Sequence, residues 1–244
     1  MSPRLATLVC CVTLVSSLAA QESATPRPRT IKTIQVTSDA MASVRTYGLL
    51  LPPDYDTSTR RYPVVYLLHG SGQRHVTWGR RTLLDGATHA IVVMPDMDRA
   101  RYVIGDRVDP QAETFLTQEL ITEIDRRYRT IASREGRSIA GLSIGGFGAM
   151  LLGLRHAELY SAVGSFSAPL DGVGDPAALL ATAPHPLLYV GCGVADSLLP
   201  ASRRFAARLE QEGVARTYEE GPGAHTWDAW DWQLRSFLLM VKAG

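Results

Sequence analysis

Short apolar and β-branched runs alternate along the chain with longer segments in which apolar residues recur at helical spacing. This alternation predicts an α/β fold, with a mostly parallel central sheet of about eight strands and helices on both faces. The predicted strands are residues 31–37, 45–51, 64–68, 90–94, 138–140, 162–166, 187–190 and 217–219. The predicted helices are residues 110–128, 145–155, 199–211 and 227–241.

Two features of the pattern predict the strand arrangement. Residues 31–37 and 45–51 are joined by a short connection, which indicates an antiparallel pair at one edge, because parallel neighbours need a crossover helix. Residues 64–68 and 90–94 are continuously apolar, as is typical of strands buried on both faces. We therefore expect these two strands in the middle of the sheet.

The first residues have the layout of a secretory signal peptide. Arg4 precedes an uncharged run over 5–18, and the segment ends in Ala19 and Ala20, which predicts a signal over residues 1–20 and a secreted or periplasmic protein. The alternatives are an uncleaved anchor, although the run is short for a span of about 20 residues, and a lipoprotein signal at Cys10 or Cys11. Residues 21–30 are rich in Ser, Thr, Pro and Arg, which predicts a disordered leader.

The amino-acid composition limits the classes of protein to which the chain can belong. With 45% hydrophobic residues in a 244-residue chain, residues 31–244 can form one catalytic domain around one core. The 25 basic and 24 acidic residues are mixed, which argues against nucleic acid or an anionic membrane as a partner. Signal cleavage would leave Cys192 as the only cysteine, so no internal disulfide is expected, and this thiol is interpreted as buried and inert.

The candidate nucleophile is Ser143. It stands in the motif Gly141-x-Ser143-x-Gly145, between the predicted strand 138–140 and the predicted helix 145–155. A serine hydroxyl is a weak nucleophile, so it must be exposed at a tight strand-to-helix turn beside a base. The backbone N–H of Ile144 would then face the developing oxyanion. The alternative is a glycine-rich helix start that only packs tightly.

The second oxyanion donor is expected in the loop after strand 64–68. The sequence there is His69-Gly70-Ser71-Gly72, and the backbone N–H of Ser71 or Gly72 is the candidate. For His69 we favour a structural side chain under the loop over a chemical role.

In the α/β-hydrolase motif the nucleophile, the acid and the base follow one another in this order along the chain, which limits the candidates for the acid and the base. His225 lies in a loop between the last predicted strand and the last predicted helix, where a base is expected. His156 falls in a predicted helix, and His185 precedes a strand, which is the wrong end for a ligand site. Asp196 follows strand 187–190 and is the candidate acid that orients His225. The aspartates weighed against it are Asp171, Asp175, Asp228 and Asp231.

Three segments together resemble the esterase D family of α/β-hydrolases. They are residues 137–149 around Ser143, the sequence Leu-x-x-Glu-Ile-Asp-Arg-Arg-Tyr at 120–128, and Pro-Gly-Ala-His-Thr-Trp-x-x-Trp at 222–230. The family includes S-formylglutathione hydrolases, feruloyl and acetyl-xylan esterase domains, enterochelin esterases and mycolyltransferases. The resemblance extends over about residues 31–241.

The resemblance implies a triad of Ser143, Asp196 and His225, oxyanion donors at Ile144 and at Ser71, and acyl chemistry without a metal or organic cofactor. Two departures stand out. The family often has methionine where this chain has Ile144, a change that leaves the backbone donor intact. The connection over 167–186 is brief for a segment that often builds a lid, which predicts a short or absent lid and an open, shallow site.

These features predict a secreted serine esterase that acts through an acyl-enzyme. The expected substrates are short acyl, feruloyl or acetyl esters of a carbohydrate-like or small molecule. Trp78 and Trp227 are candidate substrate contacts, although Trp78 is equally consistent with the core. The alternatives are an acyltransferase of the mycolyltransferase type and a non-catalytic binding module on a hydrolase scaffold.

Overall fold

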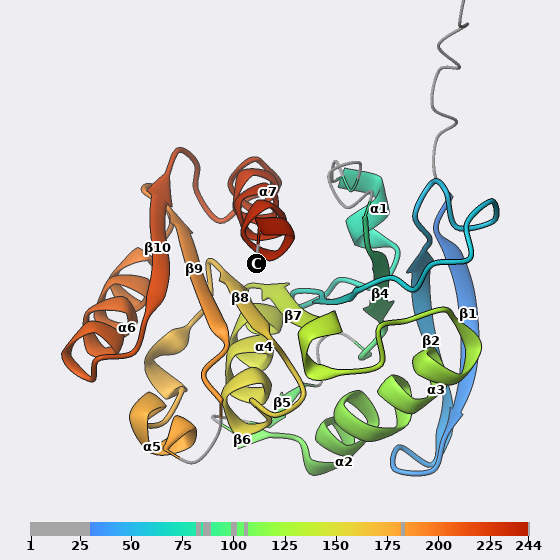
Figure 1. Cartoon of the computed structure of the whole chain (residues 1–244). Coiled ribbons are helices and arrows are strands. Elements are labelled where there is room, and N and C mark those ends of the chain that lie inside the picture. Colours follow the sequence, from blue (N-terminus) through green and yellow to red (C-terminus); the bar gives the residue numbers. More distant parts are fainter. Residues whose placement is uncertain are drawn as a thin grey trace, which may run out of the picture.

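A computed structural model describes residues 30–81, 84, 89–98, 102–104, 107–181 and 184–243. Within these residues, eight strands form one sheet in the order β1-β2-β4-β3-β7-β8-β9-β10 (Figure 1). The predicted signal peptide, Cys10 and Cys11, and the predicted leader except for Thr30 lie outside the described residues.

The eight predicted strands are all found. The sheet contains β1 (Lys32–Ser38), β2 (Ser43–Leu50), β3 (Val64–Leu68), β4 (Ile91–Pro95), β7 (Arg137–Leu142), β8 (Ala162–Phe166), β9 (Leu187–Gly193) and β10 (Arg216–Gly221). The two shortest strands, β5 (Val103–Ile104) and β6 (Arg107–Val108), form a separate hairpin that the sequence pattern did not predict.

Three of the four predicted helices form as single elements: α4 (Ile144–Arg155), α6 (Leu199–Gln211) and α7 (Trp227–Ala243). The predicted helix over 110–128 is divided into α2 (Pro110–Thr114), a π-helical segment (Phe115–Glu119) and α3 (Leu120–Arg127). The short helices α1 (Thr77–Arg81) and α5 (Pro176–Leu180) were not predicted, because a single turn or so carries too little periodicity to recognise.

The strand directions agree with the sequence-based expectation. β1 and β2 are antiparallel at one edge, and β2 is also antiparallel to β4. All the other neighbours, from β4 to β10, are parallel, so their carboxyl ends lie along one edge of the sheet. Every residue of β3 and of β4 is buried, as the continuous apolar runs predicted.

Two hydrophobic layers cover the sheet. Along β3 the side chains of Val64, Tyr66 and Leu68 join the core that also contains residues of α3, α4 and α6, whereas Val65 and Leu67 join the core formed with α1 and α7. Helices therefore cover both faces, and Figure 1 shows α1 and α7 together on one side of the sheet. This layering follows from the alternation of side chains along a strand.

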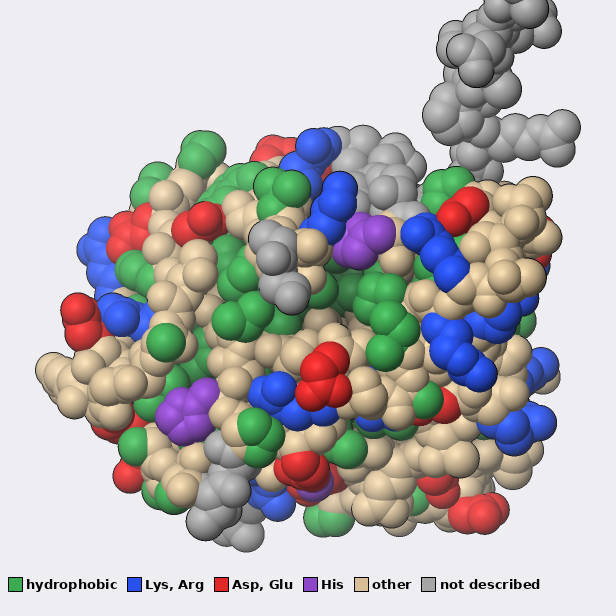
Figure 2. Space-filling model, viewed as in Figure 1, with side chains coloured by type: hydrophobic (Ala, Val, Ile, Leu, Met, Phe, Trp, Pro, Cys, Tyr) green, Lys and Arg blue, Asp and Glu red, His purple; other side chains and the backbone are tan. Residues whose placement is uncertain are grey.

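No helix within the described ranges is long and apolar enough to cross a membrane. On the face shown in Figure 2, acidic and basic side chains are interspersed, with Lys and Arg more frequent towards the β1–β2 side. The distribution agrees with the mixed charge pattern of the sequence.

Candidate active site

The candidate nucleophile occupies a strained turn between β7 and α4. Ser143 has φ 55° and ψ −127°, a backbone conformation that residues with a side chain rarely adopt. Such a conformation costs about 1–3 kcal/mol and persists only where the surroundings enforce it. Here the Ser143 N–H donates to the carbonyl oxygen of Phe166 at 2.8 Å, which ties the turn to the end of β8.

The glycines on both sides of Ser143 are required by close backbone packing. A Cβ at Gly145 would overlap the carbonyl oxygens of Leu68 and His69, and a Cβ at Gly141 would overlap the carbonyl of Gly145. The turn is therefore pressed against the end of β3. Steric contacts therefore enforce the turn at this motif, which is more than a glycine-rich helix start.

The structure brings the three residues that the sequence selected into contact. His225 Nε2 lies 3.0 Å from Ser143 Oγ, and His225 Nδ1 lies 2.9 Å from Asp196 Oδ2. Because a carboxylate only accepts, Nδ1 carries the ring proton, and Nε2 is left to accept the proton of the Ser143 hydroxyl. The Asp196 side chain is fully buried, whereas the imidazole is 36% exposed. The arrangement can deprotonate a serine hydroxyl and stabilise the imidazolium that results.

Asp196 and His225 are held by loops that are hydrogen-bonded to each other. Asp196 Oδ1 accepts the backbone N–H of Leu198 at 2.9 Å, which fixes the carboxylate from the other side. The loop after β9 is joined to the loop after β10 through the N–H of Ala195 and the carbonyl of Gly223, 2.9 Å apart. These hydrogen bonds hold Asp196 and His225, which are 29 positions apart in the sequence, next to each other.

Trp230 packs against His225 and belongs to a group of three tryptophans. The Trp230 ring lies 5.0 Å from the His225 ring, centroid to centroid, at an interplanar angle of 89°. Trp227 packs edge to face on Trp230 at 5.2 Å and on Trp78 at 5.6 Å. The predicted substrate contact at Trp78 is not supported, because this side chain is 0% exposed and belongs to the core between the sheet and α7. Trp227 is only partly buried.

The loop after β3 supplies backbone donors beside the nucleophile. Residues 70–73 form a β-turn closed by the Gln73 N–H and the Gly70 carbonyl at 3.2 Å, with Gly72 at φ 70° as this turn requires. A Cβ on Gly70 would lie 3.4 Å from the Cβ of Ser143, so the turn runs directly past the nucleophile. The Gly70 N–H donates to Gln73 Oε1, whereas the N–H groups of Ser71 and Gly72 find no acceptor among the described residues.

The start of α4 offers a further donor. Ile144 is the first residue of the helix, and the first intrahelical bond runs from the Phe147 N–H to the Ser143 carbonyl. The N–H of Ile144 therefore has no helical acceptor, and it points out of a helix N-terminus that favours negative charge. The backbone N–H groups of Ser71 and Ile144 are therefore the candidate donors next to Ser143.

The rejected candidates have other partners. His156 Nε2 lies 2.7 Å from Glu113, and Asp171 forms an ion pair with Arg204. His185 is exposed ahead of β9. Cys192 is 0% exposed, and burial raises the pKa of its thiol, so it is a poor nucleophile.

A polar network behind the loop was not foreseen from the sequence. Asp96, at the end of β4, accepts from His75 Nδ1 at 2.7 Å and from Arg74 Nε at 2.8 Å. Its carboxylate is 3% exposed. No sequence pattern links residues 74–75 with residue 96, so only the fold could reveal this contact.

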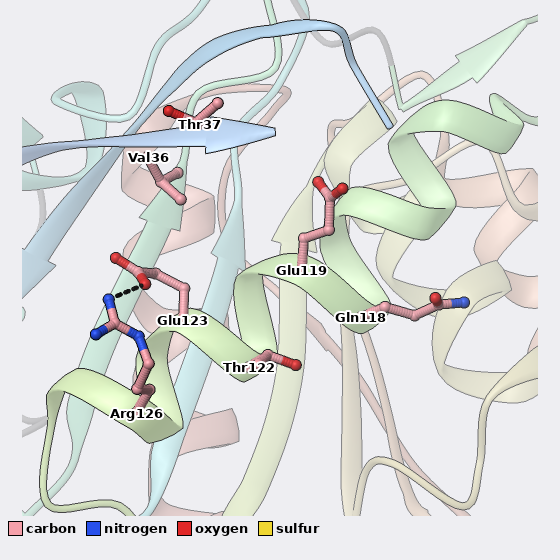
Figure 3. Close-up of a pocket in the computed structure, with 7 residues that line it drawn as sticks. All are labelled: Val36, Thr37, Gln118, Glu119, Thr122, Glu123 and Arg126. Atoms are coloured by element: carbon pink, nitrogen blue, oxygen red, sulfur yellow. Dashed lines mark hydrogen bonds and ion pairs between the residues drawn. The ribbon is translucent and has the colours of Figure 1, made fainter. Parts of the chain in front are cut away.

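A shallow hollow of about 320 Å³ lies away from these residues, between β1 and the helical segment that includes α3 (Figure 3). Its lining residues are Val36, Thr37, Gln118, Glu119, Thr122, Glu123 and Arg126. Within the described part of the chain, no group of three or more His, Cys, Asp or Glu side chains is arranged to hold a metal ion.

The eight-stranded sheet, the strand-to-helix turn at Ser143 and the loops after β9 and β10 define an α/β-hydrolase. The chain belongs to the "Putative esterase" family, whose model matches residues 38–186. This membership agrees with the resemblance found in the sequence.

Relatives of similar sequence carry esterase names. The chain is 39% identical over 131 residues to the esterase Rv1288 of Mycobacterium tuberculosis, which covers 50% of this chain and 28% of that protein. It is 29% identical over 217 residues to an endo-1,4-beta-xylanase/feruloyl esterase of Xylanibacter ruminicola, covering 77% of this chain and 29% of that protein. The chain therefore spans less than a third of the length of these relatives.

Solved structures share the architecture. A ferulic acid esterase superposes with a TM-score of 0.76 at 26% identity, covering 88% of this chain and 98% of that one. The S-formylglutathione hydrolase FrmB of Staphylococcus aureus has a TM-score of 0.76 at 20% identity, covering 87% of this chain and 98% of that one. The second likeness establishes the fold alone.

Proposed function

We propose that the protein is a serine esterase that cleaves carboxylic esters through an acyl-enzyme, with Ser143 as nucleophile, His225 as base and Asp196 as the residue that orients the base. The observation that carries the proposal is the continuous hydrogen-bonded series from Asp196 through His225 to Ser143 Oγ. Membership of the esterase family supports the same chemistry.

In the first step Ser143 Oγ attacks the ester carbonyl carbon, and His225 Nε2 takes the hydroxyl proton. The carbonyl oxygen becomes an oxyanion, which the N–H groups of Ile144 and Ser71, or Gly72, are proposed to bind. Each donor of this kind contributes about 3 kcal/mol in the transition state. The bond to the alcohol then breaks, and His225 gives its proton to the departing alkoxide.

In the second step water attacks the acyl-enzyme. His225 removes a proton from the water, the bond between the acyl carbon and Ser143 Oγ breaks, and His225 returns the proton to the serine. Both steps need an imidazole nitrogen that is free to accept a proton at the start.

Relatives suggest the substrate class. Proteins similar to this chain are named as feruloyl, ferulic acid and acetyl esterases. We propose short acyl, feruloyl or acetyl esters of a carbohydrate-like or small molecule, with Trp227 near the bound group. The comparison of p-nitrophenyl esters of graded chain length with feruloyl esters and acetylated xylan tests this assignment; equal rates on all of them would contradict it.

An acyltransferase would use the same residues. The two activities differ in the acceptor. Product analysis with added sugars or alcohols distinguishes them, because a transferase would form a new ester in place of the free acid.

Residues 1–20 are proposed to direct export, which would make the protein secreted or periplasmic. Cell fractionation with N-terminal sequencing tests this: protein outside the cytoplasm with a mature N-terminus close to residues 20–21 supports export, and protein found only in the cytoplasm with an intact N-terminus contradicts it.

A fluorophosphonate probe tests the nucleophile. We expect the folded wild-type protein to be labelled at Ser143 and to hydrolyse p-nitrophenyl acetate, and the Ser143→Ala variant to lose both properties. Undiminished hydrolysis by folded S143A protein would refute the assignment. Absence of labelling in the wild type would favour a non-catalytic binding module.

A further inference from the structure

His69 lies directly beneath the turn that carries Ser71. Its side chain is 0% exposed, and its ring packs against the ring of Tyr102 at 5.4 Å between centroids. The backbone N–H of His69 donates to Tyr102 Oη at 2.9 Å. The imidazole is therefore fixed at the end of β3 and out of contact with solvent.

The partners of the ring determine its tautomer. The backbone N–H of Met97 lies 3.1 Å from His69 Nε2, and since an amide N–H can only donate, Nε2 must be the unprotonated acceptor. The proton is then on Nδ1, which lies 2.9 Å from the carbonyl oxygen of Gly70 and donates to it. Burial lowers the pKa of His69, although the Gly70 carbonyl opposes this shift, and the ring stays neutral.

This hydrogen bond controls the direction of the next N–H. A trans peptide is planar, so the carbonyl of Gly70 and the N–H of Ser71 point in opposite directions. The Gly70 oxygen is held towards the protein interior by His69 Nδ1–H and by the Gln73 N–H. The N–H of Ser71 must consequently point away from the buried ring and out of the turn, on a loop that passes Ser143.

We propose that His69 is a positioning residue that presets the oxyanion hole by holding the Gly70–Ser71 peptide in the orientation that exposes the Ser71 N–H. The inference rests on the proposed function, because it assigns a purpose to a donor of that site. His69 does not touch the ester and exchanges no proton with it. His69 orients the Ser71 N–H before the substrate binds, so this donor is preorganised.

Two substitutions test the two hydrogen bonds of the His69 ring one at a time. In His69→Asn the amide nitrogen can take the place of Nδ1 and donate to Gly70, while the bond to Met97 is lost. In His69→Gln the longer side chain can reach the place of Nε2 and accept from Met97, while the bond to Gly70 is lost. Both variants lose the aromatic ring, so each is a control for the other's loss of packing.

We expect H69N to keep kcat for p-nitrophenyl acetate within about threefold of wild type, and H69Q to lose about 10- to 100-fold with little change in KM, since one oxyanion donor is worth about 10²–10³ in kcat. H69Q should also bind a trifluoromethyl ketone, which forms a tetrahedral adduct, more weakly by a similar factor. Equal losses in both variants, in parallel with their melting temperatures, would mean that His69 only supports folding.

A ¹⁵N NMR measurement of the His69 tautomer tests, independently of activity, whether Nδ1 donates to the Gly70 carbonyl. A protonated Nδ1 in the folded protein at neutral pH is the expected result, and a protonated Nε2 overturns the inference. If the wild type is labelled at Ser143 by a fluorophosphonate but both variants react equally fast, the role of His69 is wrong and the proposed function stands. If the wild type is not labelled, the proposed function fails, and the inference, which depends on it, fails with it.

Discussion

At the scale of single residues, the main feature is a conflict between local preference and tertiary structure at Ser143. A positive φ is unfavourable for serine, and Gly141 and Gly145 provide the space that makes the turn possible. The sequence therefore has glycine beside the strained position but not at it. A side chain is retained there because the hydroxyl is the proposed nucleophile, which is how strain comes to be concentrated at functional sites.

This strain gives a stability prediction. We expect Ser143→Gly to be more stable than Ser143→Ala by about 1 kcal/mol, because glycine adopts the positive φ freely and alanine does not. For a domain of this size the difference corresponds to about 2–4 °C in melting temperature. Both variants should be inactive, so thermal unfolding compares two proteins that differ only in the backbone preference of one residue. An alanine variant as stable as the glycine variant would show that the turn is not strained.

At the scale of elements, the first turns of α7 pack against the loop that carries His225. Trp230 packs against the His225 ring at 5.0 Å, and Trp232 Nε1 donates to the carbonyl of Pro222 at 2.9 Å. Further along the same helix, Phe237 packs on Phe166 and Tyr189 under the sheet. The helix thus combines a segment that contacts His225 with a segment that serves only the core.

The two segments can be separated by substitution. We expect Trp230→Leu to lower kcat by about tenfold or more, because a misplaced base loses its alignment with Ser143 Oγ. Phe237→Leu should lower the free energy of unfolding by about 1–3 kcal/mol and leave kcat of the folded protein unchanged. Steady-state kinetics and denaturant unfolding of both variants provide the test. Equal kcat values for W230L and F237L would contradict a positioning effect of Trp230.

At the scale of the whole molecule, a network of charged side chains, with Arg45 and Asp96 buried, joins the antiparallel edge of the sheet to the candidate site. Arg45 on β2 forms an ion pair with Asp98 at 2.5 Å and donates to the carbonyl of Asp96 at 2.8 Å. Asp96 in turn accepts from His75 and Arg74 in the segment after the Gly70–Gln73 turn. The network therefore connects β2, β4 and the loop that carries Ser71.

The network predicts a stability contribution that depends on pH. Burial favours the protonated form of Asp96, but hydrogen bonds from His75 and Arg74 outweigh it, so the pKa of Asp96 lies below its ordinary value of 3.8. The unfolded chain then takes up this proton first as the pH falls. The stabilisation is accordingly complete above the unfolded pKa and is lost below it, as the pH approaches the folded pKa.

Asp96→Asn measures that contribution. We expect the variant to be less stable than wild type by about 3 kcal/mol near neutral pH, since it removes a buried carboxylate that accepts hydrogen bonds from His75 and Arg74. The difference in unfolding free energy should shrink as the pH is lowered from about 5 towards 2, because the wild type loses its advantage there. Urea denaturation over this range is the measurement. A difference that stays constant or grows in acid would contradict the assignment.

Much of the molecule could be predicted from the sequence because its signals are local. Apolar runs identified all eight strands of the main sheet, and the motif around Ser143, with the fixed order nucleophile, acid, base, selected Asp196 and His225. The carboxyl ends of parallel strands meet at one edge, which is why residues chosen by their order along the chain meet in space.

The tertiary structure alone decided which side chains support those residues. Trp78 is buried in the core. The hydrogen bond from the Met97 N–H defines the tautomer of His69, and the Asp96 carboxylate lies beside His75. Each outcome depends on contacts between segments that are distant in sequence, and no periodicity or motif encodes them. Burial and the direction of a hydrogen bond belong to the packed molecule, so they became visible only once the strands and helices were assembled.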